Sequence, residues 1–353
     1  MAHGDHLAAA AAAGIISPAQ ARDLDRFIAA REVGDEDLLG DAEAVRFARG
    51  FHDVFLTIGL VILMIGLVFS SGIVIGTLAG YLGAGVAWLL AEYYTRSRRL
   101  VLPSIALCAG FVLMIALATG VLVEPIVNDG DPDGAERLTW APLAGALAGL
   151  AAAAGFRARF GLPFASGMVA ATASATLISL AAVAAPDSVD VLLRPLIFVA
   201  GATCFSAAMI YDLADPKRST LRADNAFWLH LAAAPLIVHS VVGGIAGEEI
   251  EIALGQAAAI LGVLAVLALV ALVIDRRAML VAGLAYLGVA IGVLVREAQV
   301  ETGSVFAITL LFLGAAVVAL GTGWGPARRA VVETLIPARM AQRLPTIRVN
   351  PDE

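Results

Sequence analysis

Charged residues are scarce in this chain. Asp, Glu, Lys and Arg make up 15% of its 353 residues, whereas a soluble domain typically has about 25%. Hydrophobic residues make up 60%, and the mean hydropathy is +0.89. A soluble globular domain is therefore excluded. We expect an all-α, polytopic bundle of transmembrane helices whose main partner is the lipid bilayer.

Cysteine is also scarce, and catalytic motifs are missing. Cys108 and Cys204 are the only cysteines, and both lie in apolar segments where they read as small hydrophobic residues. The chain has no nucleophile motif, zinc-binding helix, phosphate loop or dinucleotide fingerprint. We therefore expect no enzymatic activity, no cofactor and no metal site. The N-terminal helices are charge-balanced and lack a basic face, which argues against nucleic acid as a partner.

The apolar segments themselves contain almost no charge. Each Asp, Glu, Lys and Arg lies outside them or within a few residues of an end, with Glu92, Asp212 and Arg194 at the border. Ion-coupled transporters usually bury ionisable groups, because a carboxylate or base carries the proton. This absence argues against a carrier that depends on a carboxylate at mid-membrane depth.

Residues 1–50 form a separate, polar segment that we expect to be cytoplasmic. Ser17 and Gln20 are spaced as an N-cap and its third helical residue, with a proline between them at the first helical position. They predict a helix that runs to about residue 31. Its apolar face, formed by Leu24, Phe27 and Ile28, is a candidate surface for docking a cytoplasmic protein.

Residues 51–323 are predicted to form a transmembrane domain of about ten helices, because a span needs about 20 apolar residues. The expected spans are 54–71, 73–92, 101–123, 139–155, 161–184, 192–212, 225–246, 252–274, 278–295 and 303–321. Of the 23 Lys and Arg residues, only Arg137, Arg194 and Arg296 lie between spans on the outer side. This asymmetry predicts that both termini are cytoplasmic. The basic tail, 324–353, is expected to lie as amphipathic helices on the anionic inner face of the membrane.

The seventh span carries the candidate solute or proton contacts, which are His230, His239, Trp228 and Pro235. The two histidines are nine residues apart and face opposite sides of a straight helix, which argues against a shared metal. Pro235 removes a backbone hydrogen bond and frees carbonyl groups. Two interpretations of His239 remain open: a contact for a solute or proton, or a neutral imidazole bonded to a neighbouring span.

A second polar group lies at the inner end of the same span. An enzyme that modifies lipids would need polar side chains clustered at one membrane interface. The residues that could approach one another there are Asp212, Asp215, Asp224 and His230. The favoured interpretation is a solvated loop.

Three stretches carry a family resemblance: GIISPAQARDLDRFI at 14–28, RGFHDVFLTIGLVILMIGL at 49–67, and FWLHLAAAPLIVHS at 227–240. They resemble the bacterial predicted membrane proteins of the domain-of-unknown-function 2157 (DUF2157) family. The resemblance implies a multi-pass inner-membrane protein with a cytoplasmic helical segment before the first span. It implies no activity, since none of these motifs is catalytic.

Two functional hypotheses follow. The expected spans divide into 54–184 and 192–321, five in each half, and an odd number would insert the second half inverted relative to the first. By analogy of fold alone, this favours a carrier of small solutes. The alternative is a non-transporting scaffold or regulatory protein that docks a cytoplasmic partner through its N-terminal helices.

Overall fold

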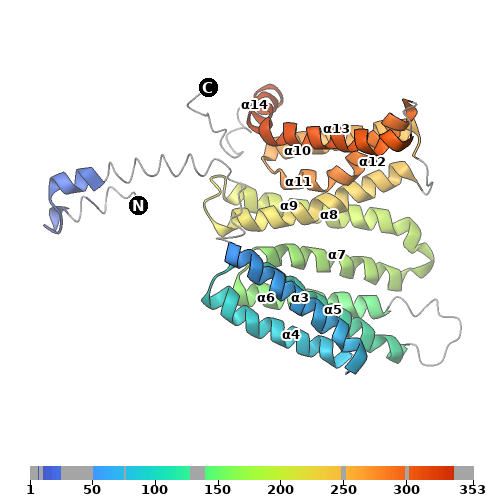
Figure 1. Ribbon diagram of the computed structural model, residues 1–353, viewed down its shortest axis with the longest axis horizontal. Helices are drawn as coiled ribbons and strands as arrows, with labels where there is room; N and C mark the ends of the chain where they lie inside the picture. The colour runs from blue at the N-terminus through green and yellow to red at the C-terminus, as the bar shows by residue number, and fades with distance from the viewer. Residues whose placement is uncertain are drawn as a thin grey trace. The chain divides into compact units, whose positions relative to one another are not determined.

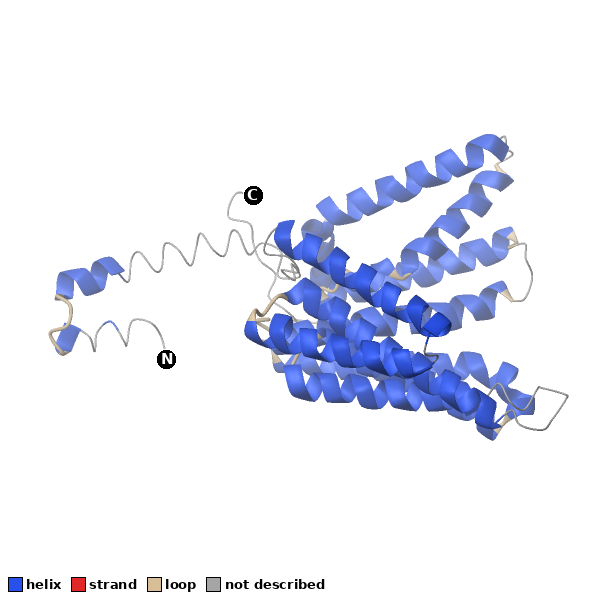
Figure 2. Cartoon of the chain, turned by 60° about the horizontal axis from the view of Figure 1, so that its bottom comes forward, coloured by secondary structure: helices blue, strands red, loops and turns tan. Residues whose placement is uncertain are grey.

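The structure is a computed structural model that describes residues 7, 11–24, 51–74, 77–127, 140–247, 252–298 and 302–337. The chain divides into two compact units, Met1–Val45 and Arg46–Glu353. In its described parts the protein consists of helices and loops, as Figure 2 shows. The expected all-helical class is confirmed for these residues.

The described part of the first unit contains the beginning of the predicted N-terminal helix, residues 18–24. Ser17 Oγ accepts a hydrogen bond from Gln20 N at 3.2 Å, and Ser17 N donates to Gln20 Oε1 at 2.9 Å. This reciprocal pair is the capping box that the sequence predicts. Leu24 is 45% exposed. Phe27 and Ile28 lie outside the described residues, so the docking face stays a prediction.

The second unit holds a helix in each of the ten expected spans. The long helices are α3 Phe51–Val74, α4 Thr77–Ala91, α5 Val101–Val127, α6 Trp140–Phe160, α7 Phe164–Ala184, α8 Val189–Ala214, α9 Leu221–Ala246, α10 Leu254–Ile274, α12 Gly283–Glu297 and α13 Thr302–Thr322. The ninth expected span is interrupted, since a short helix, α11 Ala278–Val281, precedes α12. α4 continues as a π-helix over Glu92–Ser97.

Seven helical stretches of the described part are long and apolar enough to cross a membrane. They are Val101–Glu124, Trp140–Phe160, Phe164–Ala184, Pro186–Ala214, Leu221–Ala246, Leu254–Ile274 and Ser304–Thr322. The protein is therefore a helical membrane protein. Ten spans stay a prediction, because α4 and α12 have only 15 residues each and the apolar stretch Phe51–Leu67 of α3 is also short. The orientation of the termini stays a prediction as well.

Small and aromatic residues hold the first helices together. A Cβ atom placed on Gly145 of α6 would lie 2.7 Å from the carbonyl oxygen of Ala116 on α5, so the two backbones are in close contact. Trp88 of α4 packs against Phe111 and Phe160, with ring centroids 5.2 Å and 5.1 Å apart. The resulting core joins α4, α5 and α6.

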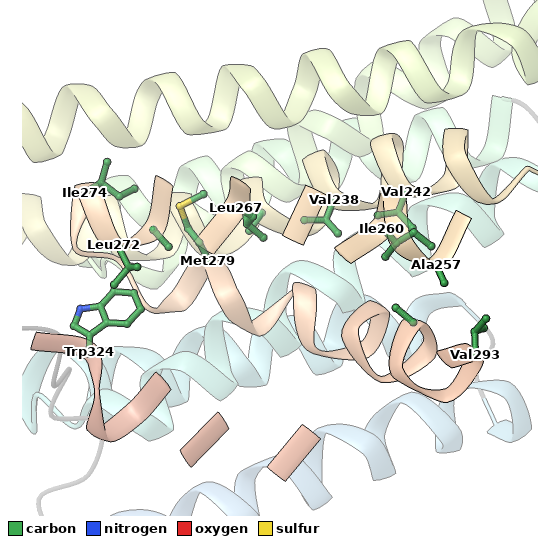
Figure 3. Close-up of a cluster of buried hydrophobic side chains, with 13 residues drawn as sticks. Val238, Val242, Ala257, Ile260, Leu267, Leu272, Ile274, Met279, Val293 and Trp324 are labelled. Atoms are coloured by element: carbon green, nitrogen blue, oxygen red, sulfur yellow. The ribbon is translucent and has the colours of Figure 1, made fainter. Parts of the chain in front are cut away.

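α7 lies between the first helices and the later ones, as Figure 1 shows. It packs against α6 on one side and against α8 and α9 on the other. Beyond it, α9, α10, α11 and α12 share a large apolar core. Figure 3 shows Val238, Leu267 and Met279, from three of these helices, within that core.

The C-terminal helix α14, Trp324–Leu335, packs on the bundle. Trp324, Arg328 and Val332, spaced one turn apart, are buried, and α14 contacts α10. Figure 3 shows Trp324 beside Leu272 of α10. Val332 of the expected amphipathic tail is therefore covered by the bundle, whereas Leu335 is 59% exposed, and the placement of the tail on the inner face of the membrane stays a prediction. The remainder of the tail, 338–353, lies outside the described residues.

Candidate functional site

Polar contacts join residues near the ends of neighbouring helices at one end of the second unit. Arg159 Nε of α6 lies 2.8 Å from Glu92 Oε1, and Arg157 Nη2 donates to the Tyr211 hydroxyl of α8 at 2.9 Å. These segments are among those that the distribution of Lys and Arg places on one side of the membrane. Their proximity agrees with that grouping, and the compartment they face stays a prediction. We call this side the basic end.

A fully buried group of three side chains lies at the basic end, and we call it the buried triad. The Asp212 carboxylate of α8 accepts hydrogen bonds from His230 Nε2 of α9 at 2.9 Å and from Arg276 Nε at 3.2 Å. Arg276 also donates through Nη2 to the other oxygen of Asp212 and, at 3.1 Å, to the Ala223 carbonyl. The triad therefore joins α8, α9 and the turn between α10 and α11.

The triad is closed to solvent in this conformation. Relative exposure is 0% for His230, 2% for Arg276 and 8% for Asp212. One carboxylate and one guanidinium balance each other, so His230 fits as a neutral imidazole that carries its proton on Nε2. Its Nδ1 atom is then an acceptor, and it has no hydrogen-bond partner among the described residues.

A second polar group, the Asp275 cluster, lies beside the triad and consists of Asp275, Arg218, Trp324 and Arg328. Asp275 Oδ1 accepts from Trp324 Nε1 at 2.8 Å, and Oδ2 faces Arg218 Nη1 at 3.2 Å. Arg328 Nε lies 3.6 Å from Oδ1. Asp275 is a left-handed residue with φ of 58° at the end of α10. It thereby links α10, α14 and the loop between α8 and α9.

That loop is closed by Asp215. Its carboxylate accepts from Thr220 N at 2.8 Å, Thr220 Oγ1 at 2.6 Å and Ser219 N at 3.2 Å. Burial raises the pKa of Asp215, but the hydrogen bonds from Thr220 and Ser219 outweigh this effect and hold the pKa below its ordinary value. Thr220 in turn caps α9 by accepting from Arg222 N.

The expectation of a solvated loop around these residues is wrong for Asp212, Asp215 and His230, which are buried. Asp212 and His230 do meet, as the less favoured interpretation required. Asp215 instead bonds within its own loop, and Asp224 is half-buried. Burial is possible because Arg276 supplies the opposite charge at the point where the carboxylate leaves water.

The other predicted contacts are dispersed. His239 Nδ1 lies 2.6 Å from the Tyr286 hydroxyl of α12, which places it on a different neighbour from His230. Trp228 packs edge-on against Phe164 of α7, with ring centroids 4.7 Å apart. Pro235 is exposed within the continuous helix α9. Within the described ranges, no group of three or more His, Cys, Asp or Glu side chains is placed to hold a metal ion.

Arg276 is the triad residue that sequence reasoning missed. A signal was present, because only Asp275, Arg276 and Arg277 separate two apolar segments. A turn this short keeps its charged side chains close to the ends of neighbouring helices. The spacing of Trp324 and Arg328, one turn apart, was a similar signal for the Asp275 cluster.

The chain was compared with known proteins in three ways. No protein-family model, no curated protein and no solved structure matches it. The site must therefore be interpreted from its own chemistry.

Proposed function

We propose that the protein is a multi-pass carrier of a small solute in the bacterial inner membrane, with ten spans and both termini in the cytoplasm. We assign the binding of the solute or proton to the buried triad. Membership of the DUF2157 family is part of the same proposal and rests on the three resembling stretches. The observation that carries the proposal is the burial of Asp212, His230 and Arg276 within or next to membrane-spanning helices.

Buried ionisable side chains in a membrane are rare, because each must leave water, and they commonly mark the path of a solute or proton. The triad is neutral as it stands, with one spare acceptor at His230 Nδ1. A proton that reaches this atom adds a positive charge beside Asp212, and a donor group of a solute that reaches it forms a hydrogen bond with His230. The bonds from Asp212 to α9 and to the α10–α11 turn then change in strength, which is how a ligand biases helix positions.

The inverted arrangement of two halves receives no support from helix packing. In the first half α3 packs against both α4 and α5. The first helix of the second half, α8, packs against α9 and α7 instead. We therefore propose the carrier without requiring a five-plus-five repeat, which stays a prediction.

A thermal-shift screen of the detergent-purified, full-length protein tests this function. The panel contains metabolites, lipids and metal ions, and a ligand at about a hundred times its dissociation constant adds roughly 2.7 kcal/mol to stability. We expect a hit that is lost in His230→Gln and retained in His239→Ala. A hit retained in both variants, or no hit across the panel, contradicts the role given to the triad.

A second candidate function is a scaffold that docks a cytoplasmic protein. It is favoured by the exposure of Leu24, 45%, on a helix in a unit separate from the bundle. Deletion of residues 1–50 separates the two functions. A carrier retains solute binding without this segment, whereas a scaffold loses its co-purifying partner.

A further inference from the structure

An apolar cavity of about 630 Å³ lies between α8, α9, α10 and α11. Phe205 of α8, Val238 of α9 and Met279 of α11 form part of its wall. α10 supplies the longest side, from Ala259 to Val270. Volumes of several hundred cubic ångströms are typical of ligand sites.

The lining of this cavity selects against polar ligands. Every side chain that lines it is apolar, and Gly262 adds no side chain at all. A polar solute placed there would lose its hydrogen bonds to water without replacing them. The lining therefore favours a hydrocarbon as the occupant.

The length of the cavity suits a lipid chain. The lining residues of α10 run from Ala259 to Val270, and the eleven helical rises between these two residues correspond to roughly 16 Å along a helix. This is about half of the 30 Å hydrocarbon core of a bilayer. Membrane lipid is the molecule that supplies long hydrocarbon chains at this depth.

The charge at one end of the cavity indicates which lipid. The Phe205 ring lies 5.3 Å from the His230 ring, and Met279 follows Arg276 by three residues. The cavity thus ends beside the basic end. Three segments lie at this end of the protein and together contain seven Lys and Arg residues and four Asp residues, an excess of three positive charges. They are 212–224, 275–277 and 324–329. Such an excess attracts an anionic head group.

We infer that the cavity binds one hydrocarbon chain of an anionic membrane lipid, whose head group lies at the basic end. The inference goes beyond the proposed function and does not depend on it, because a lipid can bind there whether or not the protein carries a solute. Its contact with Phe205 and Met279 places the chain next to the buried triad.

The test uses photoactivatable phosphatidylglycerol with a diazirine in one acyl chain. Full-length protein is reconstituted in phosphatidylcholine nanodiscs with a trace of this probe, irradiated and digested, and the labelled peptides are mapped. We expect label to concentrate on the cavity segments of α9 and α10. Exposed residues of α13, such as Phe306 at 73% exposure, report the background from surrounding lipid.

A matched pair of variants on α10 sharpens the test. A Cβ atom at Gly262 or at Gly255 meets no atom within 4 Å, so both positions accept a larger side chain. Gly262 lines the cavity, whereas Gly255 does not. Gly262→Phe displaces two or more methylene groups and should reduce cavity labelling by about tenfold. Gly255→Phe should leave it unchanged.

The head group is tested with the same diazirine chain on phosphatidylcholine. We expect this zwitterionic probe to label the cavity much more weakly than phosphatidylglycerol does. Equal labelling by the two probes, label spread evenly over α13 and the cavity, or full labelling of Gly262→Phe would each overturn the inference. None of these results depends on solute transport, so the inference and the proposed carrier fail separately.

Discussion

Helices α3–α6 and helices α8–α14 differ in how many charged side chains they bury. The first group is joined by close backbone contacts such as Gly145 with Ala116, and by aromatic rings around Trp88. Of the buried acidic and basic side chains in the described part, Asp53 alone lies in the first group. The others, including Asp212 and Arg276, lie in the second.

We propose from this difference where function resides. Helices α4, α5 and α6 of the first group pack closely through small and aromatic side chains. The second group nevertheless keeps a buried triad beside an apolar cavity. Because buried charge is costly to maintain, we assign solute or proton binding to the second group and a structural role to the first.

The largest expected effect comes from Asp212→Ala. This change leaves Arg276 buried without its carboxylate, and breaking a buried pair in this way costs about 3–5 kcal/mol. The free energy of unfolding in mixed micelles measures it. Asp190→Ala is the matched control, since Asp190 is an exposed carboxylate in the first turn of the same helix. Equal losses in the two variants would remove the distinction between the groups.

A steric change tests the close contact between α5 and α6 of the first group. Gly145→Ala places a methyl group 2.7 Å from the Ala116 oxygen, and overpacking of this kind costs about 1–3 kcal/mol. Gly155→Ala, on the same helix with nothing within 4 Å, should instead stabilise by about 0.5–1 kcal/mol. Thermal unfolding of both variants measures the difference. A neutral Gly145→Ala would mean that α5 and α6 do not pack closely.

Much of the fold was predictable from sequence, because apolar segments of about 20 residues must be helical in lipid. Each of the ten expected segments holds a helix, and the capping box at Ser17 forms as predicted. The triad was not predictable in the same way. Asp212 and Arg276 are 64 positions apart, and their contact depends on how α8 packs near the α10–α11 turn.

The predicted histidines show the same limit. Helical spacing correctly indicated that His230 and His239 face different neighbours, which are Asp212 and Tyr286. It did not indicate which histidine would be buried with charged partners. That outcome is determined by tertiary contacts from α8 and α12, which a single segment does not encode.

A smaller effect is expected at acidic pH from Asp215. Its folded pKa is lowered, so the stabilisation that it provides is present above the unfolded pKa of about 4 and is lost as the pH falls through the folded value. Asp215→Asn should remove about 1–2 kcal/mol near pH 7. It should also flatten the pH dependence below pH 4, which melting curves at several pH values measure. An unchanged acid dependence would show that the Thr220 bonds do not act on ionised Asp215.

The smallest effect is expected from His239→Ala. His239 is exposed and its bond to Tyr286 joins α9 to α12, an interaction worth about 0.6 kcal/mol in membrane proteins. Tyr286→Phe should have a similar effect, and the double variant should add little further loss. His230→Ala should cost clearly more in the same unfolding measurement. A larger loss of stability from His239→Ala than from His230→Ala would contradict the role assigned to the buried triad.

The central claim is that the triad is reachable from water in some conformation, as a carrier requires, and cysteine accessibility in membranes tests it most directly. In a background with Cys108→Ala and Cys204→Ala, a cysteine is placed at Ala233 of α9, one turn from His230, or at Ala153 of α6; both alanines are 0% exposed. We predict that a water-soluble thiol reagent labels the Ala233→Cys variant and leaves the Ala153→Cys variant unlabelled. If neither variant is labelled, the triad is a sealed structural contact and the carrier proposal is contradicted.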